Sequence, residues 1–417
     1  MGRTDYLLRK DEAGLIVGLD IGTSKVIAIV GEVDASGDMT VVGMGSHPSR
    51  GLKKGVVVNI EATVQSIQRA VEQAEQMASC KVHSVYAGIG GSHIRSLNSH
   101  GVTAIRSREV TPDDIARVID AARVVAIPAD QKVLHILPRE FVIDNQEGIH
   151  EPVGMSGVRL EAKVHLVTGA VSAAQNIVKC VQRCGLEVDD VILEQLASSR
   201  AVLTEDEKEL GVCLIDIGAG TTALAVYTGG AIAHTAVIPI AGDQVTNDIA
   251  IALRTPTQHA EEIKVQHGCC MNELAGDNES LEVAGMGERA PRRLSRQALV
   301  DVVRPRYQEL FELVQAELQR SGQENAVAAG IVITGGSARM IGVAELAEDV
   351  FHLPVRTGTP QGMRGLEPTL HDPVYATAAG LLLVGNENRL ARLNRPLIGG
   401  PSGGVLARMK NWFMGNF

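Results

Sequence analysis

A strand, a glycine turn and a second strand follow one another twice in this chain, about half its length apart. The first copy runs from Leu15 to Gly31 and turns through DIGTSK, which begins at Asp20. The second runs from Val212 to Tyr227 and turns through DIGAGTT, which begins at Asp216. β-Branched apolar residues on both sides of each turn favour strands. The repeat therefore predicts two related lobes with a ligand bound between them.

The glycine turns distinguish between two designs for binding phosphate. P-loops and dinucleotide-binding folds lead their glycine turn into a helix, whereas here a strand follows each turn. Backbone N–H groups in such hairpins form anion-binding nests, and Asp20 and Asp216 suit a hydrated Mg²⁺ ion. A third turn, Gly335-Gly336-Ser337, follows a buried strand candidate and would let a flat ring approach the backbone. The alternative is that each aspartate only caps its own turn.

Strand and helix patterns alternate in both halves of the chain, which predicts α/β lobes. Helices are expected at 60–77, from Thr111-Pro112 onward, at 176–184 before Gly185, and at 304–320. The turn-rich segment 276–293 is predicted to be a surface loop, and the glycine-rich segment 399–404 a flexible linker.

Composition excludes several classes of protein. The 417 residues are 45% apolar and carry a net charge of −10, which argues against nucleic-acid binding because that needs clustered basic residues. The first residues lack the apolar run of a signal peptide, and no stretch is apolar for the length of a membrane span. The six cysteines show no metal or disulfide spacing. Core packing is expected for the cysteines, and also for His135 and His165, which have apolar neighbours in the sequence.

The three glycine turns together resemble the actin/Hsp70/sugar-kinase ATPase superfamily. Within it the chain is similar to the FtsA family, the actin-related bacterial division proteins, over about residues 14–385 and again in the last helix. The stretches that carry this likeness are 49–51, 153–162, 205–217, 227–230 and 260–268. The resemblance implies a two-lobed, actin-like α/β ATPase fold with a duplicated phosphate-binding hairpin core and a C-terminal amphipathic helix on a flexible linker.

The resemblance also implies ATP with Mg²⁺ in the cleft, where Asp20 and Asp216 would hold the ion through water. The implied nucleotide-binding residues are Asp20, Gly22, Thr23, Ser24, Lys25, Asp216, Gly218, Gly220, Thr221, Thr222, Glu262, Lys264, Gly335, Gly336 and Ser337. The implied domains are a first lobe core at 14–84 and 164–196, an inserted subdomain at 85–163, a second lobe at 197–385 with a smaller subdomain at about 230–305, a linker at 386–404 and a membrane-targeting helix at 405–417.

The second hairpin departs from the superfamily pattern at two positions. Ala219 stands where relatives often have glycine, and Ala223 where hydrolytic relatives have a second carboxylate that orders Mg²⁺ and water. We therefore expect ATP binding with slow or absent hydrolysis. The only candidates for a catalytic base are Glu194 and Gln195. The alternative function, a small-molecule kinase of the sugar or acetate type, would need one of them in that role.

A group of arginines lies between the second hairpin and the third glycine turn. It comprises Arg289, Arg292, Arg293, Arg296, Arg304 and Arg306. Two interpretations are open: a solvated face, or a docking patch for the C-terminal tail of tubulin-like FtsZ, which the family resemblance locates in this part of the chain.

The last thirteen residues form an amphipathic pattern. On a helix, Val405, Leu406, Met409, Trp412, Phe413 and Phe417 fill an arc of about 140°, with Arg408 and Lys410 just outside its two edges. From Asn388 onward there are five basic residues and no acidic one. A helix of about 20 Å is too short to span a bilayer but suits its surface.

These features predict an ATP-binding, actin-like division protein that self-associates, anchors FtsZ filaments to an anionic membrane surface and helps to recruit later division proteins. The expected location is the cytoplasmic face of the inner membrane at the septum. An Hsp70-type chaperone is disfavoured, because about 30 residues after Gly385 cannot hold a peptide-binding domain.

Overall fold

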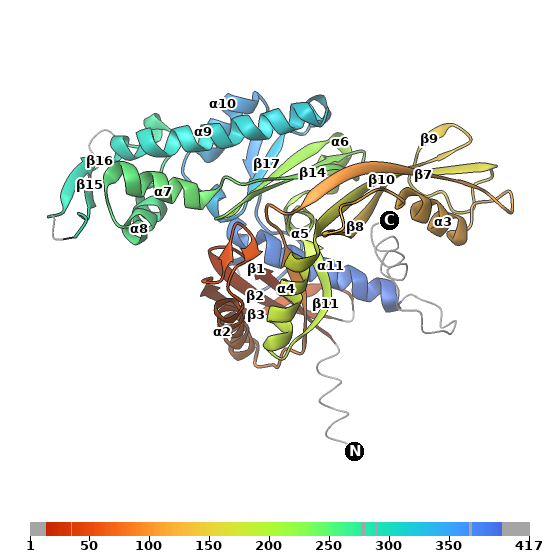
Figure 1. Cartoon of the computed structure of the whole chain (residues 1–417), viewed down its shortest axis with the longest axis horizontal. Helices are drawn as coiled ribbons and strands as arrows, with labels where there is room; N and C mark the ends of the chain where they lie inside the picture. The colour runs from red at the N-terminus through yellow and green to blue at the C-terminus, as the bar shows by residue number, and fades with distance from the viewer. Residues whose placement is uncertain (1–13, 35, 277–279, 288–289, 367–368, 394–417) are drawn as a thin grey trace, which may run out of the picture.

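Two five-stranded sheets with the same strand order form the centre of the molecule (Figure 1). The computed structural model describes residues 14–34, 36–276, 280–287, 290–366 and 369–393. The first sheet has the order β11-β6-β1-β2-β3 and the second the order β14-β13-β12-β17-β18. The first sheet consists of β1 (Leu15–Ile21), β2 (Lys25–Val33), β3 (Met39–Pro48), β6 (Ser84–Ile89) and β11 (Glu187–Leu193). The second consists of β12 (Val212–Ile217), β13 (Thr222–Thr228), β14 (Ala231–Ile238), β17 (Ile331–Thr334) and β18 (Val355–Thr357).

The two sheets are related strand by strand. In each, the predicted hairpin is antiparallel (β1 with β2, β12 with β13), and a later strand pairs in parallel with its first strand (β6 with β1, β17 with β12). The predicted internal repeat and the α/β fold class are thereby confirmed.

Helices cover both faces of the first sheet and join the two lobes. α2 (Ile60–Ala78) and α4 (Val171–Arg183) share a core with one face, and α11 (Ala376–Leu393) packs on the other. α5 (Glu194–Val202) crosses α11 so closely that a Cβ on Gly380 would lie 1.7 Å from the Ala197 carbonyl oxygen. The short helix α6 (Glu205–Leu210) follows α5 into the second lobe.

The second sheet carries its own helical layer. α7 (Gly242–Leu253), α8 (Thr257–His267), α9 (Arg296–Arg320) and α10 (Val343–Phe351) contribute to a single core with β12, β13 and β17. α7, α8 and the small hairpin β15 (Ser280–Val283) with β16 (Arg292–Ser295) lie at one end of the molecule (Figure 1).

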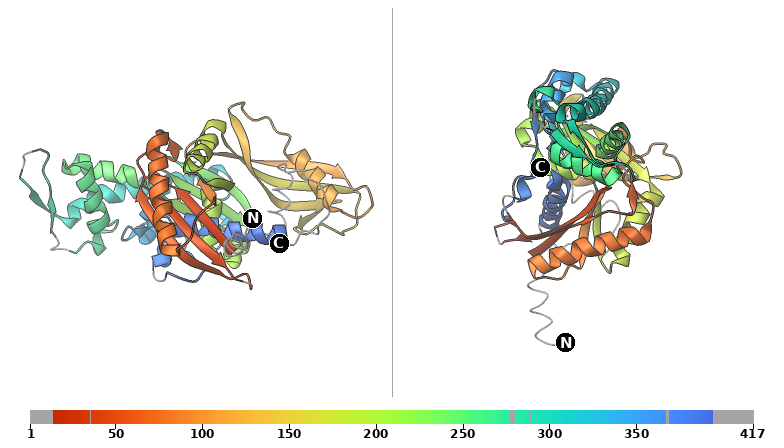
Figure 2. Two further views of the ribbon diagram at one scale, coloured as in Figure 1. Left: turned by 90° about the horizontal axis from the view of Figure 1, so that it is seen from below. Right: turned by 90° about the vertical axis from the view of Figure 1, so that its left-hand side faces the viewer.

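A third, four-stranded sheet lies at the opposite end of the molecule, as the left-hand view of Figure 2 shows. Its order is β7-β10-β8-β9, and α3 (Pro112–Ala122) packs on one face. The strands are β7 (Arg95–Ala104), β8 (Gln131–Ile143), β9 (Gln146–Ile149) and β10 (Arg159–Ala170). Because β6 pairs with β1, the chain leaves the first sheet after Ile89, a few residues later than the predicted boundary at 85.

The predicted helices are present, with some shifted ends. α2 matches the periodic segment, and α3 begins at the Thr111 cap with a complete capping box to Asp114. α9 begins at Arg296 rather than Arg304, since the Ser295 side chain caps it and Leu299, Val300 and Val303 are buried. α11 extends to Leu393, so the first part of the predicted linker is helical.

The prediction of a loop over 276–293 is wrong for part of that segment. Strand β15 lies within it and pairs with β16, and its Leu281 and Val283 side chains enter the core of the second lobe. Only these two apolar residues alternate with polar ones, and turn-forming residues surround them. The sequence pattern is therefore too short to indicate a strand.

His165 is a core residue, as predicted, whereas His135 is half-buried. His135 Nε2 accepts the Leu193 N–H at 3.0 Å. His165 is fully buried on β10, and its two ring nitrogens contact Asn98 Oδ1 at 2.7 Å and Thr235 Oγ1 at 2.9 Å. His165 therefore joins the third sheet to β14 of the second lobe.

We predict that His165 makes the stability of the protein depend on pH. Burial, with His234 and Arg139 nearby, lowers its pKa from 6.5 to about 3. The native state thus stays neutral below pH 6.5 while the unfolded state binds a proton, so stability falls as the pH decreases from 6.5 towards 3. At pH 5 the contribution is about 2 kcal/mol.

Urea unfolding at pH 7 and pH 5 measures this effect. The wild type should lose about 2 kcal/mol more between the two values than His165→Gln does. His100→Gln, an exposed change on β7 opposite Lys163, should behave as the wild type. Equal losses in the wild type and His165→Gln would contradict the prediction.

Candidate functional site: a cleft between the two lobes

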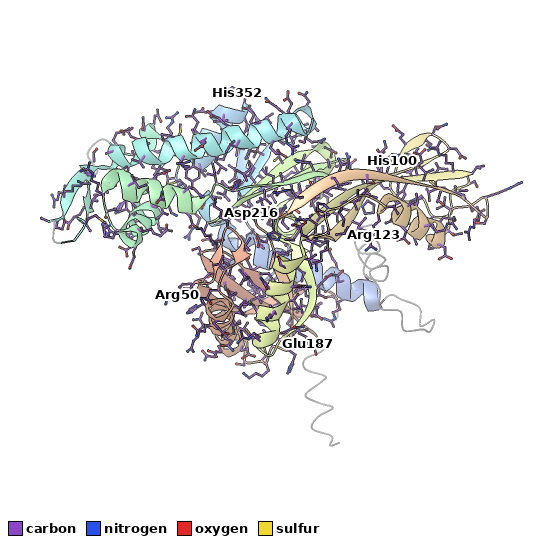
Figure 3. All side chains as sticks on the ribbon, in the orientation of Figure 1. Arg50, His100, Arg123, Glu187, Asp216 and His352 are labelled. Atoms are coloured by element: carbon purple, nitrogen blue, oxygen red, sulfur yellow. The ribbon has the colours of Figure 1, made fainter. Side chains whose placement is uncertain are left out.

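A cavity of about 430 Å³ lies where the two hairpins face each other. It is lined by both hairpin turns, by the third glycine turn, by one face of α8 and by the first residues of α5 and α11. The label of Asp216 in Figure 3 marks its place at the centre of the molecule, between the two lobes.

The two hairpin turns have the same geometry. The Gly22 N–H donates to the Lys25 carbonyl oxygen, and the Gly218 N–H donates to the Thr221 carbonyl oxygen, both at 3.1 Å. A Cβ on Gly22 or Gly218 would lie within 3.0 Å of that same carbonyl oxygen, so each turn requires glycine. The duplication therefore extends to the backbone atoms that face the cavity.

Hydrogen bonds from the N-terminus of α7 and from the third glycine turn fix the turn of the second hairpin. The N–H groups of Gly242 and Asp243 donate to the carbonyl oxygens of Gly218 and Ala219, at 3.2 and 2.7 Å. The Ser337 hydroxyl donates to the Gly218 oxygen at 2.8 Å. These bonds fix the carbonyl groups of Gly218 and Ala219 in the turn, which lines the cavity.

Three carboxylates meet at the base of the cavity. Burial and Asp216 raise the pKa of Asp20 to about 7. Burial also raises the pKa of Asp216, although Thr377 donates to its Oδ2 at 3.2 Å. The pKa of Glu194 is raised well above its usual value by burial and by both aspartates. Such a cluster binds protons or a cation, because three like charges in a cleft repel one another.

Glycines allow other backbone segments to approach these carboxylates. A Cβ on Gly335, whose φ is +87°, would lie 2.3 Å from Asp216 Oδ1. A Cβ on Gly90 would lie 2.0 Å from Glu194 Oε2. Ala223 lines the cavity beside Asp216, its partner in the strand register, so a methyl group occupies that point.

The other end of the cavity is partly apolar. Val265 of α8 and Gly268, which directly follows this helix, line the cavity together with Met340 and Ile341, which follow the third glycine turn. Lys264 Nζ donates to the Gly242 carbonyl oxygen at 3.2 Å and to Thr246 Oγ1 at 2.9 Å, and pairs with Glu261 at 2.7 Å. This arrangement offers an apolar slot, lined by Val265, Met340 and Ile341, beside a fixed cation.

Most of the predicted nucleotide-binding residues line this one cavity. They are Asp20, Gly22, Thr23, Ser24, Lys25, Asp216, Gly218, Gly220, Thr221, Lys264, Gly335, Gly336 and Ser337. Two do not. Thr222 is fully buried and donates to the Ile240 carbonyl oxygen at 2.7 Å. Glu262 lies on the outer face of α8 beside His259, and its neighbour Glu261 lines the cavity instead.

Several lining residues were not predicted from the sequence. Glu261 is one residue away from the predicted position, so the helical period of α8 could have found it. Gly55, Tyr307 and Thr377 come from distant segments with no local motif for phosphate or base binding.

The predicted arginine group is divided among different contacts. Arg292 donates to the Leu253 carbonyl oxygen, and Arg296 to the His267 carbonyl oxygen at 2.9 Å. Arg306 forms an ion pair with Asp248. Arg293 is exposed on β16, and Arg304 is half-buried on α9. Arg289 lies outside the described residues.

The predicted membrane-binding residues Val405, Leu406, Arg408, Met409, Lys410, Trp412, Phe413 and Phe417 also lie outside the described residues. Within the described part of the chain, no helix combines the length and apolar character needed to cross a membrane.

The cavity fits a magnesium nucleotide by three observations. Carboxylates with raised pKa values cluster at one point, glycine turns from both lobes line the cavity around them, and an apolar slot lies in another part of it. Asp20 and Asp216 would hold the ion through water, both hairpins the phosphates, and the slot the base. The bound ion would neutralise charge between the phosphates and the carboxylates.

Two lobes of one topology around such a cleft define an actin-like fold. The structure matches a PilM–PilN type IV pilus biogenesis complex with a TM-score of 0.66 at 18% identity, over 89% of this chain and 98% of the other. It matches MreB5 of Spiroplasma citri bound to ADP with a TM-score of 0.59 at 16% identity, over 92% of this chain and 100% of the other.

Sequence comparison identifies the family. The model for cell division protein FtsA matches residues 213–380, and the model for the SHS2 domain inserted in FtsA matches 91–168. Cell division protein FtsA of Pseudomonas aeruginosa is 64% identical over 97% of this chain and 98% of that protein. The Escherichia coli K12 protein is 50% identical over 92% and 93%. The chain belongs to the FtsA family and has a role in cell division.

We predict that Asp216→Asn stabilises the nucleotide-free protein. The change removes one buried charge from the cluster of three carboxylates and keeps an oxygen that can accept from Thr377. Relief of such a site raises the free energy of unfolding by about 0.5–2 kcal/mol. Denaturant unfolding without nucleotide or Mg²⁺ measures this. The control Asp301→Asn, on the exposed face of α9, should change nothing. A destabilised Asp216→Asn protein would contradict the interpretation of the cluster.

Proposed function

We propose that the chain binds ATP with Mg²⁺ between its lobes and uses this state for self-association in cell division. The observation that carries the proposal is the convergence of Asp20 and Asp216, from two hairpins of equal geometry, on one cavity with glycine-lined walls. Membership of the FtsA family and the actin-like fold support interactions with other division proteins and with further copies of the chain.

Hydrolysis of the bound nucleotide is proposed to be slow or absent. The methyl group of Ala223 stands beside Asp216, where a further carboxylate would order water in hydrolytic relatives. Glu194 faces the same cavity, where burial and the two aspartates raise its pKa in the absence of a cation. A Mg²⁺ ion in the cleft would lower that pKa again, so Glu194 does not argue against turnover. The missing carboxylate at Ala223 is the feature that supports binding over turnover.

The proposed Mg²⁺ role predicts a metal-dependent loss of affinity in Asp216→Asn. Calorimetric titration with ATP in excess Mg²⁺ should show a dissociation constant about 10- to 100-fold higher than that of the wild type, because a charge-assisted contact to the hydrated ion is lost. In EDTA the two proteins should bind alike. Asp301→Asn should match the wild type in both conditions. An equal loss with and without Mg²⁺ would exclude the ion from this position.

Attachment of FtsZ is proposed for the end of the second lobe that carries the arginines. Arg293 is exposed there, and Arg292 and Arg296 fix the adjoining β16 and α9 through backbone carbonyl groups. An exposed cation on a strand held by these hydrogen bonds suits an acidic peptide tail. Arg306 contributes indirectly, since it is paired with Asp248. The third sheet, at the opposite end, remains available for later division proteins.

Membrane attachment is proposed for residues 405–417. Six apolar side chains give a gross gain of roughly 9–18 kcal/mol, but burial at the interface is partial and ordering a residue costs about 1–2 kcal/mol. A single tail therefore binds weakly. Assembled copies bind more strongly because their tails act together. The proposed location is the cytoplasmic face of the inner membrane at the septum.

Trp412→Glu is predicted to abolish most co-sedimentation of assembled protein with anionic liposomes, since it replaces the largest apolar side chain of the predicted helix with a charge inside its apolar arc. Asn411→Glu adds the same charge on the opposite side of that helix and should leave most of the binding intact. Sedimentation with ATP and Mg²⁺ measures both. If the two variants behave alike, charge alone, rather than the apolar face, governs attachment.

A further inference from the structure

The β4–β5 hairpin places its tip against the phosphate end of the cleft. β4 (Leu52–Lys53) and β5 (Val56–Val57) are joined by Lys54 and Gly55, whose φ angles are +50° and +74°. Positive φ at both turn residues is the geometry of a tight two-residue hairpin. Gly55 lines the cavity, although the residues around it in the sequence do not resemble a phosphate-binding motif.

The tip touches the hairpin turns of both lobes. The Gly55 N–H donates to Thr23 Oγ1 of the first turn at 3.0 Å. A Cβ on Gly220, in the second turn, would lie 3.0 Å from Lys54 Cα and 2.7 Å from Thr23 Oγ1. The absence of a side chain at Gly220 thus allows three segments, from both lobes, to meet at one point.

The bond from Gly55 also orients the Thr23 hydroxyl group. A hydroxyl group accepts through its lone pairs and donates one hydrogen atom. Because the N–H of Gly55 occupies a lone pair, the Thr23 hydrogen remains available for an acceptor in the cavity, such as a phosphate oxygen. The tip therefore acts on the phosphate site through Thr23 as well as through its own position.

The base of the hairpin is fixed, so the tip is held in place. The Gly51 carbonyl oxygen accepts the N–H groups of Val58 and Asn59, at 2.8 and 3.1 Å, and the Asn59 side chain caps α2. On the other side, a Cβ on Gly55 would lie 2.5 Å from Gly91 Cα, in the turn that packs on Glu194.

We propose that Lys54 and Gly55 form a third element of the phosphate site, in which the Lys54 ammonium group binds the terminal phosphate of a nucleoside triphosphate. The inference rests on the proposed nucleotide binding. Lys54 is exposed, and no ion pair occupies it within the described residues. Its Cα would lie 3.0 Å from a Cβ on Gly220 of the second turn, and the adjacent Gly55 lines the cavity, so the Lys54 side chain starts beside the phosphate end of the cleft. A nucleoside diphosphate lacks the group that this cation would bind.

Affinities for Mg–ATP and Mg–ADP, measured by calorimetry on the full chain, test the proposal. Lys54→Gln should weaken ATP binding at least about tenfold and change ADP binding less than about twofold, and Lys54→Arg should restore most of the difference. Lys53→Gln is the matched control: it removes the same charge one residue away, on the strand that pairs with Val56, and should change neither affinity.

Parallel losses for ATP and ADP in Lys54→Gln, or no loss at all, would overturn the proposal, as would an equal effect of Lys53→Gln. A wild-type chain that binds neither nucleotide would instead overturn the proposed function. Hydrogen exchange gives a second measurement: the peptide over residues 50–58 should be more protected by Mg²⁺ with a non-hydrolysable ATP analogue than by Mg–ADP. Equal protection by the two nucleotides counts against the tip as a terminal-phosphate element.

Discussion

Repulsion among three carboxylates at the centre of the cleft is the constraint around which the two lobes are arranged. Asp20 and Asp216 end equivalent strands, and Glu194 begins the helix that joins the lobes. Burial raises the pKa of each, so the cluster is costly without protons or a cation. A protein keeps such a cluster where ligand binding offsets its cost, and the proposed Mg²⁺ ion is a ligand of that kind.

Close backbone contacts are the means by which the lobes surround these carboxylates. Glycine occurs where another segment's backbone or carboxylate must pass: Gly335 beside Asp216, Gly90 beside Glu194, and Gly220 beside Thr23 and Lys54. Each added Cβ would lie within 3.0 Å of one of these neighbours. The abundance of glycine in the chain thus has a geometrical cause at this site, beyond the turns that a sequence pattern reveals.

Local signals made the central fold and much of the site predictable. Each turn and its two strands lie within 17 residues or fewer, with the glycines and the aspartate between the strands, so both copies can be located and compared from the amino-acid sequence alone. Thr222 and Glu262 show the limit of that approach. Each is one residue away from a cavity-lining position, and only the strand pairing of β13 and the rotation of α8 decide which neighbour faces inward. Lys54, Gly55 and Thr377 reach the cleft through tertiary packing, which leaves no local pattern.

The helix α11 connects the cleft with the end of the described chain. Near its N-terminus Thr377 bonds Asp216, and near its C-terminus Glu387 pairs with Arg200 of α5 and Arg389 donates to the Gly14 carbonyl oxygen. Between them, a Cβ on Gly380 would overlap the Ala197 carbonyl group, and one on Gly18 of β1 would lie 2.5 Å from the Ala378 carbonyl oxygen. A helix packed this closely against both α5 and β1 belongs to the packing of the first lobe, yet its first turn also shares a core with β12, β13 and β17 of the second lobe. The end of α11 that bonds Asp216 is therefore the end that joins the two lobes, and it lies opposite the end that leads to the proposed membrane segment.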